Sequence, residues 1–462
     1  MLEEIIKKRL EKLAVLKSRK INPYPAEAKR TLTASAAVSD FARLSKTKKT
    51  FWLTGRLRSF RDQGGVVFTD LEDESGRVQI ILKKKFTKDF EVFKNNLDVG
   101  DFVEAGGRLI ETKTGQKSLE AKNCKILVKS LRPLPSEWFG LKDIEERFRQ
   151  RYLDFILNPE AKKKIVLRGQ LIAEIRKILW QDGFLEVETP MLQHLPGGAK
   201  AEPFKTYYRA LKEDLYLRIA PELFLKRMLV GGFEKIFEIG RNFRNEGVDK
   251  DHNPEFTMME LYWAYQDYAG LMKFVREFLL KVFRSLGFKN SIVYEGKKIN
   301  ISGRWEQITF DKALRKFYGD KADNLNVSEA DEVFKKIVRP NLINPTFVIN
   351  HPTAISPLAK TNKKDPDLAD RFQLVMAGVE LVNAFSELND PIDQLERLEE
   401  QERLFRAGDK EASRFDEDFI EALEHGMPPA AGMGMGIDRL AAILTNSHSV
   451  KEIIAFPTLK SK

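Results

Sequence analysis

Cysteine is nearly absent from this chain, since Cys124 is the only one among 462 residues. A single cysteine excludes a disulfide framework and a cysteine-based zinc site, and it permits a reducing compartment. No apolar run approaches the ~20 residues of a membrane span. The charged, amphipathic N-terminal segment lacks the apolar centre of a secretion signal. We therefore expect a cytoplasmic protein with no membrane association.

Internal repeats and low-complexity tracts are also absent. Hydrophobic residues make up 42% of the chain and charged residues 32%, which is typical of globular rather than disordered proteins. A length of 462 residues exceeds one compact core, so two or three domains are expected. The formal net charge of +10 favours a polyanionic partner, although a basic enzyme without such a partner has the same charge.

The first part of the chain predicts a helix followed by a small barrel. Residues 2–20 carry an apolar stripe at helical spacing. Five short β-rich segments follow, separated by glycine-containing turn signals: Phe51–Leu57, Val66–Leu71, Val78–Leu82, Phe102–Ile110 and Ser118–Val128. The oligonucleotide-binding (OB) fold is the obvious five-stranded barrel of this size. We place this domain at residues 1–135, with the proline-rich stretch 131–135 as a linker.

The remainder, residues 143–462, mixes helices and strands and predicts an α+β domain. Residues 160–182 have strong helical periodicity, and Phe184–Thr189 then alternates as a strand that ends at Pro190. A second long helix is expected over Gly270–Leu286. The stretch Asp390–Glu424 is dense in Glu and Arg and predicts solvated helices.

The most informative segment is Arg241-Asn-Phe-Arg-Asn-Glu246, followed by His252-Asn-Pro-Glu-Phe256 and Met259-Glu-Leu-Tyr262. Near-alternation on both sides of a polar stretch predicts an antiparallel hairpin. On extended strands, Phe256, Met258, Glu260 and Tyr262 share one face, and so do Arg244 and Glu246. This is a poor core face, and it predicts the floor of a polar pocket.

A glycine run, Gly432-Met-Gly-Met-Gly-Ile-Asp-Arg439, leads into an apolar helix. It is not a dinucleotide fingerprint, because that pattern needs a glycine where Ile437 stands and no βαβ unit precedes it. Glycines at this place let the backbone approach a ligand near a helix start, with Arg439 in the first turn.

These features resemble the class II aminoacyl-tRNA synthetases, most closely those that charge tRNA with lysine. Three signatures of that class occur in order: the long helix and strand ending at Pro190, the Phe243-Arg-Asn-Glu246 hairpin, and the glycine run ending in Arg439. Further matching segments are Leu192–Gly198, Ile219-Ala-Pro-Glu222, Phe385-Ser-Glu-Leu-Asn-Asp390 and Ala422-Leu-Glu-His-Gly426. Any one is a weak signal, whereas all of them in order form a strong one.

The resemblance implies an N-terminal anticodon-binding barrel and a catalytic domain built on an antiparallel sheet flanked by helices. It also implies a homodimer that uses ATP and Mg²⁺ to join L-lysine to tRNA(Lys). Activation joins a carboxylate to the α-phosphate of ATP, so the catalyst must hold two anions in line. The catalytic candidates are Arg244, which suits both anions, and Arg439.

The resemblance also assigns ligand roles. The implied ATP-binding residues are Arg244, Glu246, His252, Phe256, Glu380 and Arg439. The implied lysine-binding residues are Gly198, Glu222, Arg244, Glu260, Tyr262, Asn383 and Glu387. A buried substrate ammonium requires carboxylates, and none of the residues implied at the ε-ammonium end of the pocket, Glu260, Tyr262 and Glu387, is basic. The sequence therefore favours a cationic substrate over aspartate.

Magnesium and the anticodon complete the implied ligands. Glu380 matches a metal-ligand glutamate, and Gln373 is a weaker candidate because relatives usually have a second glutamate there. Asp251 also departs from the usual arginine or threonine. In the barrel, Arg61, Phe68 and Gln79 match anticodon-binding residues.

Simpler interpretations compete with these roles. Arg244 could pair with Glu246, Arg439 could pair with Asp438, and Phe68 could belong to the barrel core. Three other functions also remain open: a class II synthetase for another amino acid, an enzyme that transfers lysine to a protein, and a degenerate paralogue that only binds RNA. Relatives that modify proteins lack the barrel, and Arg244, Glu246 and Arg439 argue against degeneracy.

Overall fold

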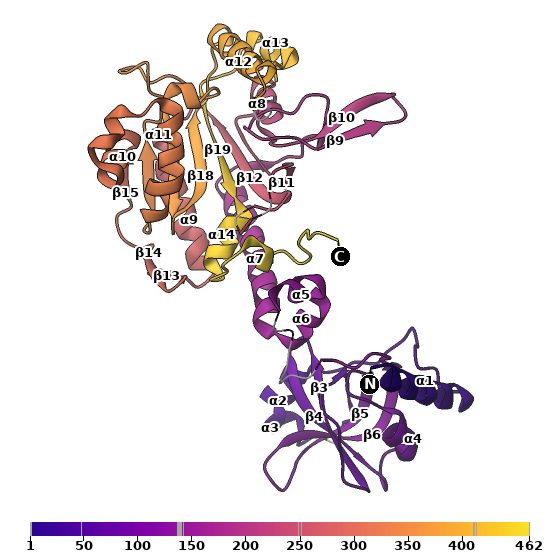
Figure 1. Cartoon of the computed structure of the whole chain (residues 1–462). Helices are drawn as coiled ribbons and strands as arrows, with labels where there is room; N and C mark the ends of the chain where they lie inside the picture. The colour runs from indigo at the N-terminus through magenta and orange to yellow at the C-terminus, as the bar shows by residue number, and fades with distance from the viewer. Residues whose placement is uncertain are drawn as a thin grey trace. The chain divides into compact units, whose positions relative to one another are not determined.

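The computed structural model describes residues 2–47, 49–135, 141, 143–247, 249–250, 252–409, 412 and 414–461. The chain divides into two compact units, Met1–Gly140 and Leu141–Lys462 (Figure 1). Asp251 lies outside the described residues. No helix in the described part is long and apolar enough to cross a membrane.

The first unit is a closed barrel with three helices before it and one, α4, between its strands β4 and β5. Its helices are α1 (Leu2–Ser18), α2 (Ala34–Ser39), α3 (Phe41–Leu44) and α4 (Phe90–Asn96). Its strands are β1 (Phe51–Leu57), β2 (Arg61–Asp62), β3 (Val66–Asp73), β4 (Gly76–Lys83), β5 (Phe102–Glu111) and β6 (Lys117–Val128). The order is β1-β5-β6-β4-β3-β2, and a β1–β3 pairing closes the sheet. The five predicted strands are confirmed, and β2 is an addition that pairs Arg61 with Phe68.

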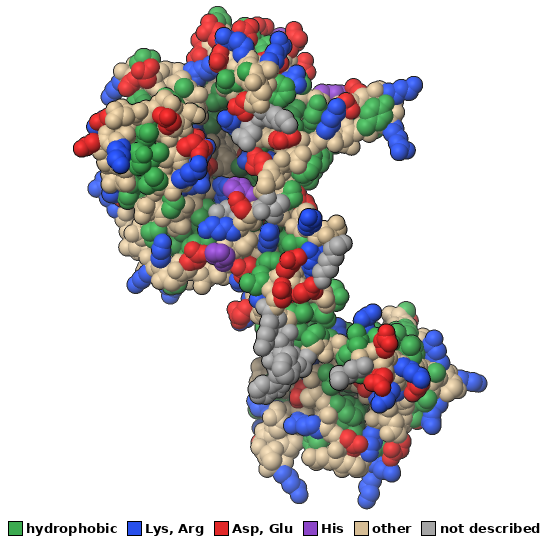
Figure 2. Space-filling view, in the orientation of Figure 1, with side chains coloured by type: hydrophobic (Ala, Val, Ile, Leu, Met, Phe, Trp, Pro, Cys, Tyr) green, Lys and Arg blue, Asp and Glu red, His purple; other side chains and the backbone are tan. Residues whose placement is uncertain are grey.

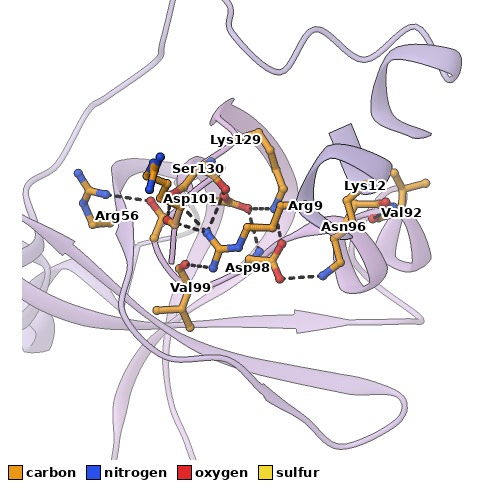
Figure 3. Close-up of polar contacts among 12 residues, drawn as sticks. Arg9, Lys12, Arg56, Val92, Asn96, Asp98, Val99, Asp101, Lys129 and Ser130 are labelled. Atoms are coloured by element: carbon orange, nitrogen blue, oxygen red, sulfur yellow. Dashed lines mark hydrogen bonds and ion pairs between the residues drawn. The ribbon is translucent and has the colours of Figure 1, made fainter. Parts of the chain in front are cut away.

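A buried polar network joins α1 to this barrel (Figure 3). The Arg9 guanidinium donates to the Val99 carbonyl at 2.9 Å and to the Ser130 carbonyl at 3.0 Å. The Lys129 ammonium, with none of its side chain exposed, lies between the carboxylates of Asp98 and Asp101. Burying these charges is tolerable because each has a partner of opposite sign or several carbonyl acceptors. The network fixes α1 although most of its residues are exposed.

The second unit is built on an eight-stranded sheet in the order β15-β16-β17-β18-β19-β12-β11-β7 (Figure 1). These strands are β7 (Leu185–Glu186), β11 (Lys235–Phe243), β12 (Glu255–Ala264), β15 (Glu306–Thr309), β16 (Thr346–Ile349), β17 (Arg371–Met376), β18 (Val379–Ser386) and β19 (Ala430–Gly436). The six central strands are antiparallel, as predicted, whereas the β15–β16 and β7–β11 pairs at the edges are parallel. The sheet is therefore mixed.

This unit also contains ten α-helices in the residues that the structure describes. They include α5 (Ile144–Arg149), α6 (Arg151–Leu157), α7 (Pro159–Gln181), α8 (Glu222–Val230), α9 (Tyr268–Ser285), α10 (Phe310–Tyr318), α11 (Val327–Val333), α12 (Pro391–Arg406), α13 (Glu417–Glu424) and α14 (Ile437–Leu444). Apolar residues of α7, α9 and α14 form the main core with the sheet. Two small sheets complete the unit: β8 (Leu192–Gln193), β9 (Lys205–Tyr208) and β10 (Glu213–Leu217) in one, and β13 (Ser291–Tyr294) and β14 (Lys297–Asn300) in the other.

Two predicted strands are shorter than expected. The Phe184–Thr189 strand is confined to β7, because beyond it Thr189 turns to the Glu238 carboxylate and Pro190 has no N–H for a ladder. The prediction that Arg244 and Glu246 share a strand face is wrong, since β11 ends at Phe243. The Arg244 N–H donates to the Pro254 carbonyl at 2.9 Å, which takes the chain out of the strand into a loop.

Candidate active site

A cavity of about 250 Å³ in the second unit lies over β12, β19 and β18. Strand alternation decides which side chains reach it. Met259 and Leu261 of β12 are fully buried in the helix-covered core, whereas Met258, Glu260 and Tyr262 line the cavity. Figure 2 shows the face of this unit hollowed, with acidic and basic side chains around the opening.

The glycines of β19 form the middle of the cavity floor. In the β12–β19 pairing, Gly436, Gly434 and Gly432 lie opposite Met258, Glu260 and Tyr262 respectively. A Cβ at Gly432 would collide with the Tyr262 ring and the Glu387 carboxylate. Because these three glycines have no side chains, a groove runs along β19, and a ligand in it can contact the polar groups of β12.

Cationic and aromatic groups gather at one part of the cavity. The half-buried Arg244 guanidinium lies over the Phe256 ring, 5.1 Å from its centroid. Arg439 donates to His252 Nε2 at 3.2 Å, so the ring Nδ1–H donates to the Asp249 carboxylate at 2.9 Å. Burial lowers the pKa of Arg244, and Glu246 opposes that shift. The cation nevertheless stays charged at neutral pH.

The structural pairings considered for the two arginines are not formed. Arg244 makes no ion pair with any residue that the structure describes, and its Nε is buried without a hydrogen-bond partner. Asp438 instead accepts hydrogen bonds from Arg168 at 2.8 Å and from the Thr257 N–H at 2.9 Å. Asp438 thus ties the start of α14 to β12, which leaves Arg439 directed into the cavity.

Carboxylates gather at another part of the cavity. Glu222 at the start of α8 and Glu260 on β12 are 7% and 4% exposed. Burial raises the pKa of the Glu260 carboxyl well above its usual range, and the charge of Glu222 adds to the shift. Tyr262 OH donates to Glu260 at 3.0 Å, and burial among these carboxylates raises the pKa of the phenol, which therefore stays protonated. This part of the cavity suits a cation.

Glu387 lies behind the cavity wall rather than among its lining residues. Its carboxylate forms an ion pair at 2.6 Å with Lys226, a fully buried lysine of α8 that also pairs with Glu222 at 2.7 Å. None of the assigned pocket positions is itself basic, but Lys226 is a cation behind this end of the cavity that the sequence reasoning did not include. The Glu222 and Lys226 positions, four apart on a helix, gave no signal of this role, because such pairs are common on exposed helix faces.

Two further residues, Asn383 and Gly198, line the cavity. Asn383 on β18 has its side-chain oxygen held by Arg371 at 2.9 Å, which directs its amide N–H₂ away from that bond. Arg371 is a functional candidate that the sequence reasoning missed. Gly198 has φ +84°, and a Cβ there would approach the Glu222 Cβ to 2.8 Å, so only glycine fits.

A β-bulge brings Glu380 to the cavity. The β17–β18 register shifts between Leu374 and Val375, so one extra residue on β18 lets Glu380 and Asn383, three positions apart, both line the cavity. Gln373 Nε2 donates to Glu380 Oε2 at 3.0 Å, and Gln373 Oε1 is buried without a partner. No cluster of three His, Cys, Asp or Glu residues able to hold a metal occurs in the described residues.

The three anticodon candidates lie on the side of the barrel sheet that faces away from the core, where Arg61 is exposed, Phe68 half-exposed and Gln79 buried. Register places Arg61 opposite Phe68, Phe68 opposite Ile81, and Gln79 two residues before Ile81 on the same strand. Val67 and Thr69 point to the interior, so Phe68 is half-exposed and does not belong to the barrel core. Gln79 accepts a hydrogen bond from Ser118 at 2.9 Å. The structure thus brings a cation, an aromatic and an amide together.

Comparison with known proteins identifies the two units. Residues 143–460 match the family described as tRNA synthetases class II (D, K and N), and residues 51–127 match the OB-fold nucleic acid binding domain. The chain is 45% identical to the lysine–tRNA ligase of Moorella thermoacetica, over 98% of this chain and 97% of that protein. It is 44% identical to the lysine–tRNA ligases of Carboxydothermus hydrogenoformans and Pelotomaculum thermopropionicum, covering all of this chain and 99% and 96% of theirs. The chain therefore belongs to the lysine–tRNA ligase family of class II tRNA synthetases.

Proposed function

We propose that this chain activates L-lysine with ATP to lysyl-adenylate and transfers the lysyl group to tRNA(Lys). The proposal rests on one observation: a single cavity has an acidic part and a basic part. Three buried carboxylates, Glu222, Glu260 and Glu387, stand at or behind one part of it, and Arg244 and Arg439 occupy another. Ammonium groups and phosphates need these two environments respectively.

Lysine fits the first environment. We assign its α-ammonium to Glu222 and the Gly198 backbone, because both line the cavity beside one another. Its ε-ammonium is assigned to Glu260, Tyr262 and Glu387. The α-carboxylate is assigned to Arg244 and to the Asn383 amide, whose oxygen is already held by Arg371.

ATP fits the second environment. Phe256 and Arg439 are assigned to the two faces of adenine, Glu246 to its amino group and His252 to the β- and γ-phosphates. A lysine carboxylate oxygen attacks the α-phosphorus, forming an O–P bond, while the α-to-β bridging bond breaks and pyrophosphate leaves. Arg244 stabilises the charge that develops on the α-phosphate, because its guanidinium can contact both reacting groups at once.

The decisive test is ATP–pyrophosphate exchange with each of the twenty amino acids, followed by aminoacylation of tRNA. Lysine alone should support exchange above background. Exchange driven by another amino acid would indicate a synthetase of different specificity. Binding of tRNA without exchange would indicate a degenerate RNA-binding paralogue, and lysine transfer to a protein but not to tRNA would indicate a modifying enzyme.

Magnesium is proposed to enter mainly with ATP. Glu380 and the partnerless oxygen of Gln373 fit an oxygen-preferring ion, but they supply only one negative charge. When bound, Mg²⁺ would neutralise charge on the phosphates. Within the protein, Gln373 orients Glu380 by its hydrogen bond.

We therefore expect Gln373→Glu to lower the Mg²⁺ concentration needed for half-maximal exchange, and Glu380→Ala to abolish nearly all activity. A Mg²⁺ titration of exchange, with calorimetric titration of Mg²⁺ into the complex with a non-hydrolysable ATP analogue, measures both effects. An unchanged midpoint for Gln373→Glu would mean that glutamine ligates as well as glutamate or lies outside the metal shell.

The outer barrel face formed by Arg61, Phe68 and Gln79 is proposed to bind the anticodon. Base stacking on an aromatic contributes about 1–3 kcal/mol per base. Phe68→Ala should therefore weaken aminoacylation by about ten- to a hundredfold in kcat/KM for tRNA, with exchange unchanged, and tRNA binding should weaken steeply as salt rises. Equal damage to both reactions would instead make Phe68 a folding residue.

A homodimer is also proposed. Apolar side chains that stay exposed on α7 and on the segment after β7 would be covered by a second copy; they include Val166, Trp180, Met191 and Leu192. A cytoplasmic location is proposed from the single free cysteine, which needs no oxidising compartment.

A further inference from the structure

Lys226 is a buried cation that the proposed reaction leaves without a role. None of its side chain is exposed, and its ammonium lies 2.7 Å from Glu222 and 2.6 Å from Glu387. The ammonium also lies 5.4 Å from the centroid of the Phe385 ring. An ammonium so deeply buried is tolerated only with close partners of opposite charge, and two carboxylates supply them. Both carboxylates raise its pKa, so the group stays charged.

This ion pair leaves one oxygen of Glu387 available. Lys226 engages Oε2, whereas Oε1 is buried and receives no hydrogen bond from any described residue. Oε1 lies beside Tyr262 at the place that a Cβ on Gly432 would fill. Because Gly432 has no side chain, Oε1 fills the space over its Cα, next to Tyr262 and Gly432, which both line the cavity. Lys226 thus fixes the carboxylate with its second oxygen next to two residues that line the cavity.

The charges around this part of the cavity balance only when Lys226 is counted. In their ionised forms Glu222, Glu260 and Glu387 together carry three negative charges, and Lys226 cancels one of them. The nearby Glu238 is already paired with Arg218. Two negative charges remain, which equals the number of ammonium groups on a diamino acid. A monoamino acid would leave one buried carboxylate without a cation.

We propose that Lys226 is a positioning residue that sets specificity for a diamino acid, by fixing the positions of Glu222 and Glu387 and cancelling one of three buried charges. This inference rests on the proposed lysine-activating function. The effect of Lys226 on lysine binding is not a simple matter of charge attraction or repulsion. Removing a cation would strengthen binding of lysine if the three carboxylates stayed ionised. Without a buried counter-ion they cannot all do so, and a protonated Glu387 no longer binds an ammonium.

The test is Lys226→Met, which keeps an unbranched side chain one atom shorter than lysine and removes its charge. In ATP–pyrophosphate exchange we expect the KM for lysine to rise at least tenfold, while kcat and the KM for ATP change less than threefold. Lys129→Met is the matched control, because it removes an equally buried ammonium between two carboxylates of the barrel. It should leave the KM for lysine unchanged.

An unchanged or lower KM for lysine in folded Lys226→Met would overturn the inference, and so would an equal rise in both KM values. If the methionine variant does not fold, Lys226→Gln replaces it, with the same expected and overturning results. Wild-type protein without lysine-dependent exchange would instead refute the proposed function, so the two failures are distinguishable.

Discussion

Arg244→Gln is expected to lower kcat for lysine-dependent ATP–pyrophosphate exchange by about 100- to 1,000-fold, or about 3–4 kcal/mol. The guanidinium lies in the cavity without an ion pair to any described residue, and its Nε is buried without a partner. Because the Arg244 guanidinium has no ion-pair partner among the described residues, it is available to bind an anionic ligand. Removing it costs most in the transition state, where charge on the α-phosphate is greatest.

Arg241→Gln is the matched control for this variant. Arg241 stands three residues earlier on β11, pairs with Glu255 at 3.9 Å and does not line the cavity. It should retain exchange within about threefold, and thermal unfolding should show both variants folded. A folded Arg244→Gln variant that loses less than tenfold in kcat would show that Arg244 does not stabilise the reacting phosphate.

The parts of this fold that were predictable from sequence are those in which the side-chain period repeats locally. The five barrel strands and the helices α1, α7 and α9 follow from periods of 2 and 3.6 residues, which depend on neighbours in the chain. The pocket face of β12 follows in the same way, since Met258, Glu260 and Tyr262 all line the cavity. Parallel pairing at the sheet edges has no such local signature.

The parts that were not predictable depend on contacts distant in sequence. The loop beyond Phe243 is set by a hydrogen bond to Pro254, and the cavity positions of Glu380 and Asn383 depend on one bulge in β18. Lys226 illustrates the same limit. Four residues after Glu222 it resembles a surface ion pair, and only the packing of Glu387 against it makes it a buried counter-ion. Family resemblance gave Asn383 and Glu380 their roles, whereas strand alternation alone places them on opposite faces.

The pocket charge can be tested directly at Glu387. Glu387→Gln keeps the shape of the side chain and removes its charge, so kcat/KM for lysine should fall by about 2–4 kcal/mol. The loss should appear mainly in the KM for lysine, because ATP contacts other residues. Glu104→Gln, which changes a buried carboxylate of the barrel, is the control and should leave exchange unchanged. Normal activation of lysine by folded Glu387→Gln would exclude Glu387 from the pocket.

The same carboxylate predicts a pH dependence. Burial raises the pKa of Glu387 to about 8, with Lys226 opposing and Glu222 supporting the shift, while Tyr262 stays protonated beside it. Below that pH the Glu387 carboxyl is protonated when no lysine is bound. This proton must leave when lysine binds, since the substrate ammonium binds the ionised carboxylate. The KM for lysine should therefore fall as pH rises from about 6.5 to 8.5, a range in which the substrate ε-ammonium stays charged. Glutamine cannot titrate, so the dependence of the KM for lysine on pH should disappear in Glu387→Gln. A dependence that persists in this variant would assign the proton to another group. Glu260 is the next candidate, because burial also raises its pKa.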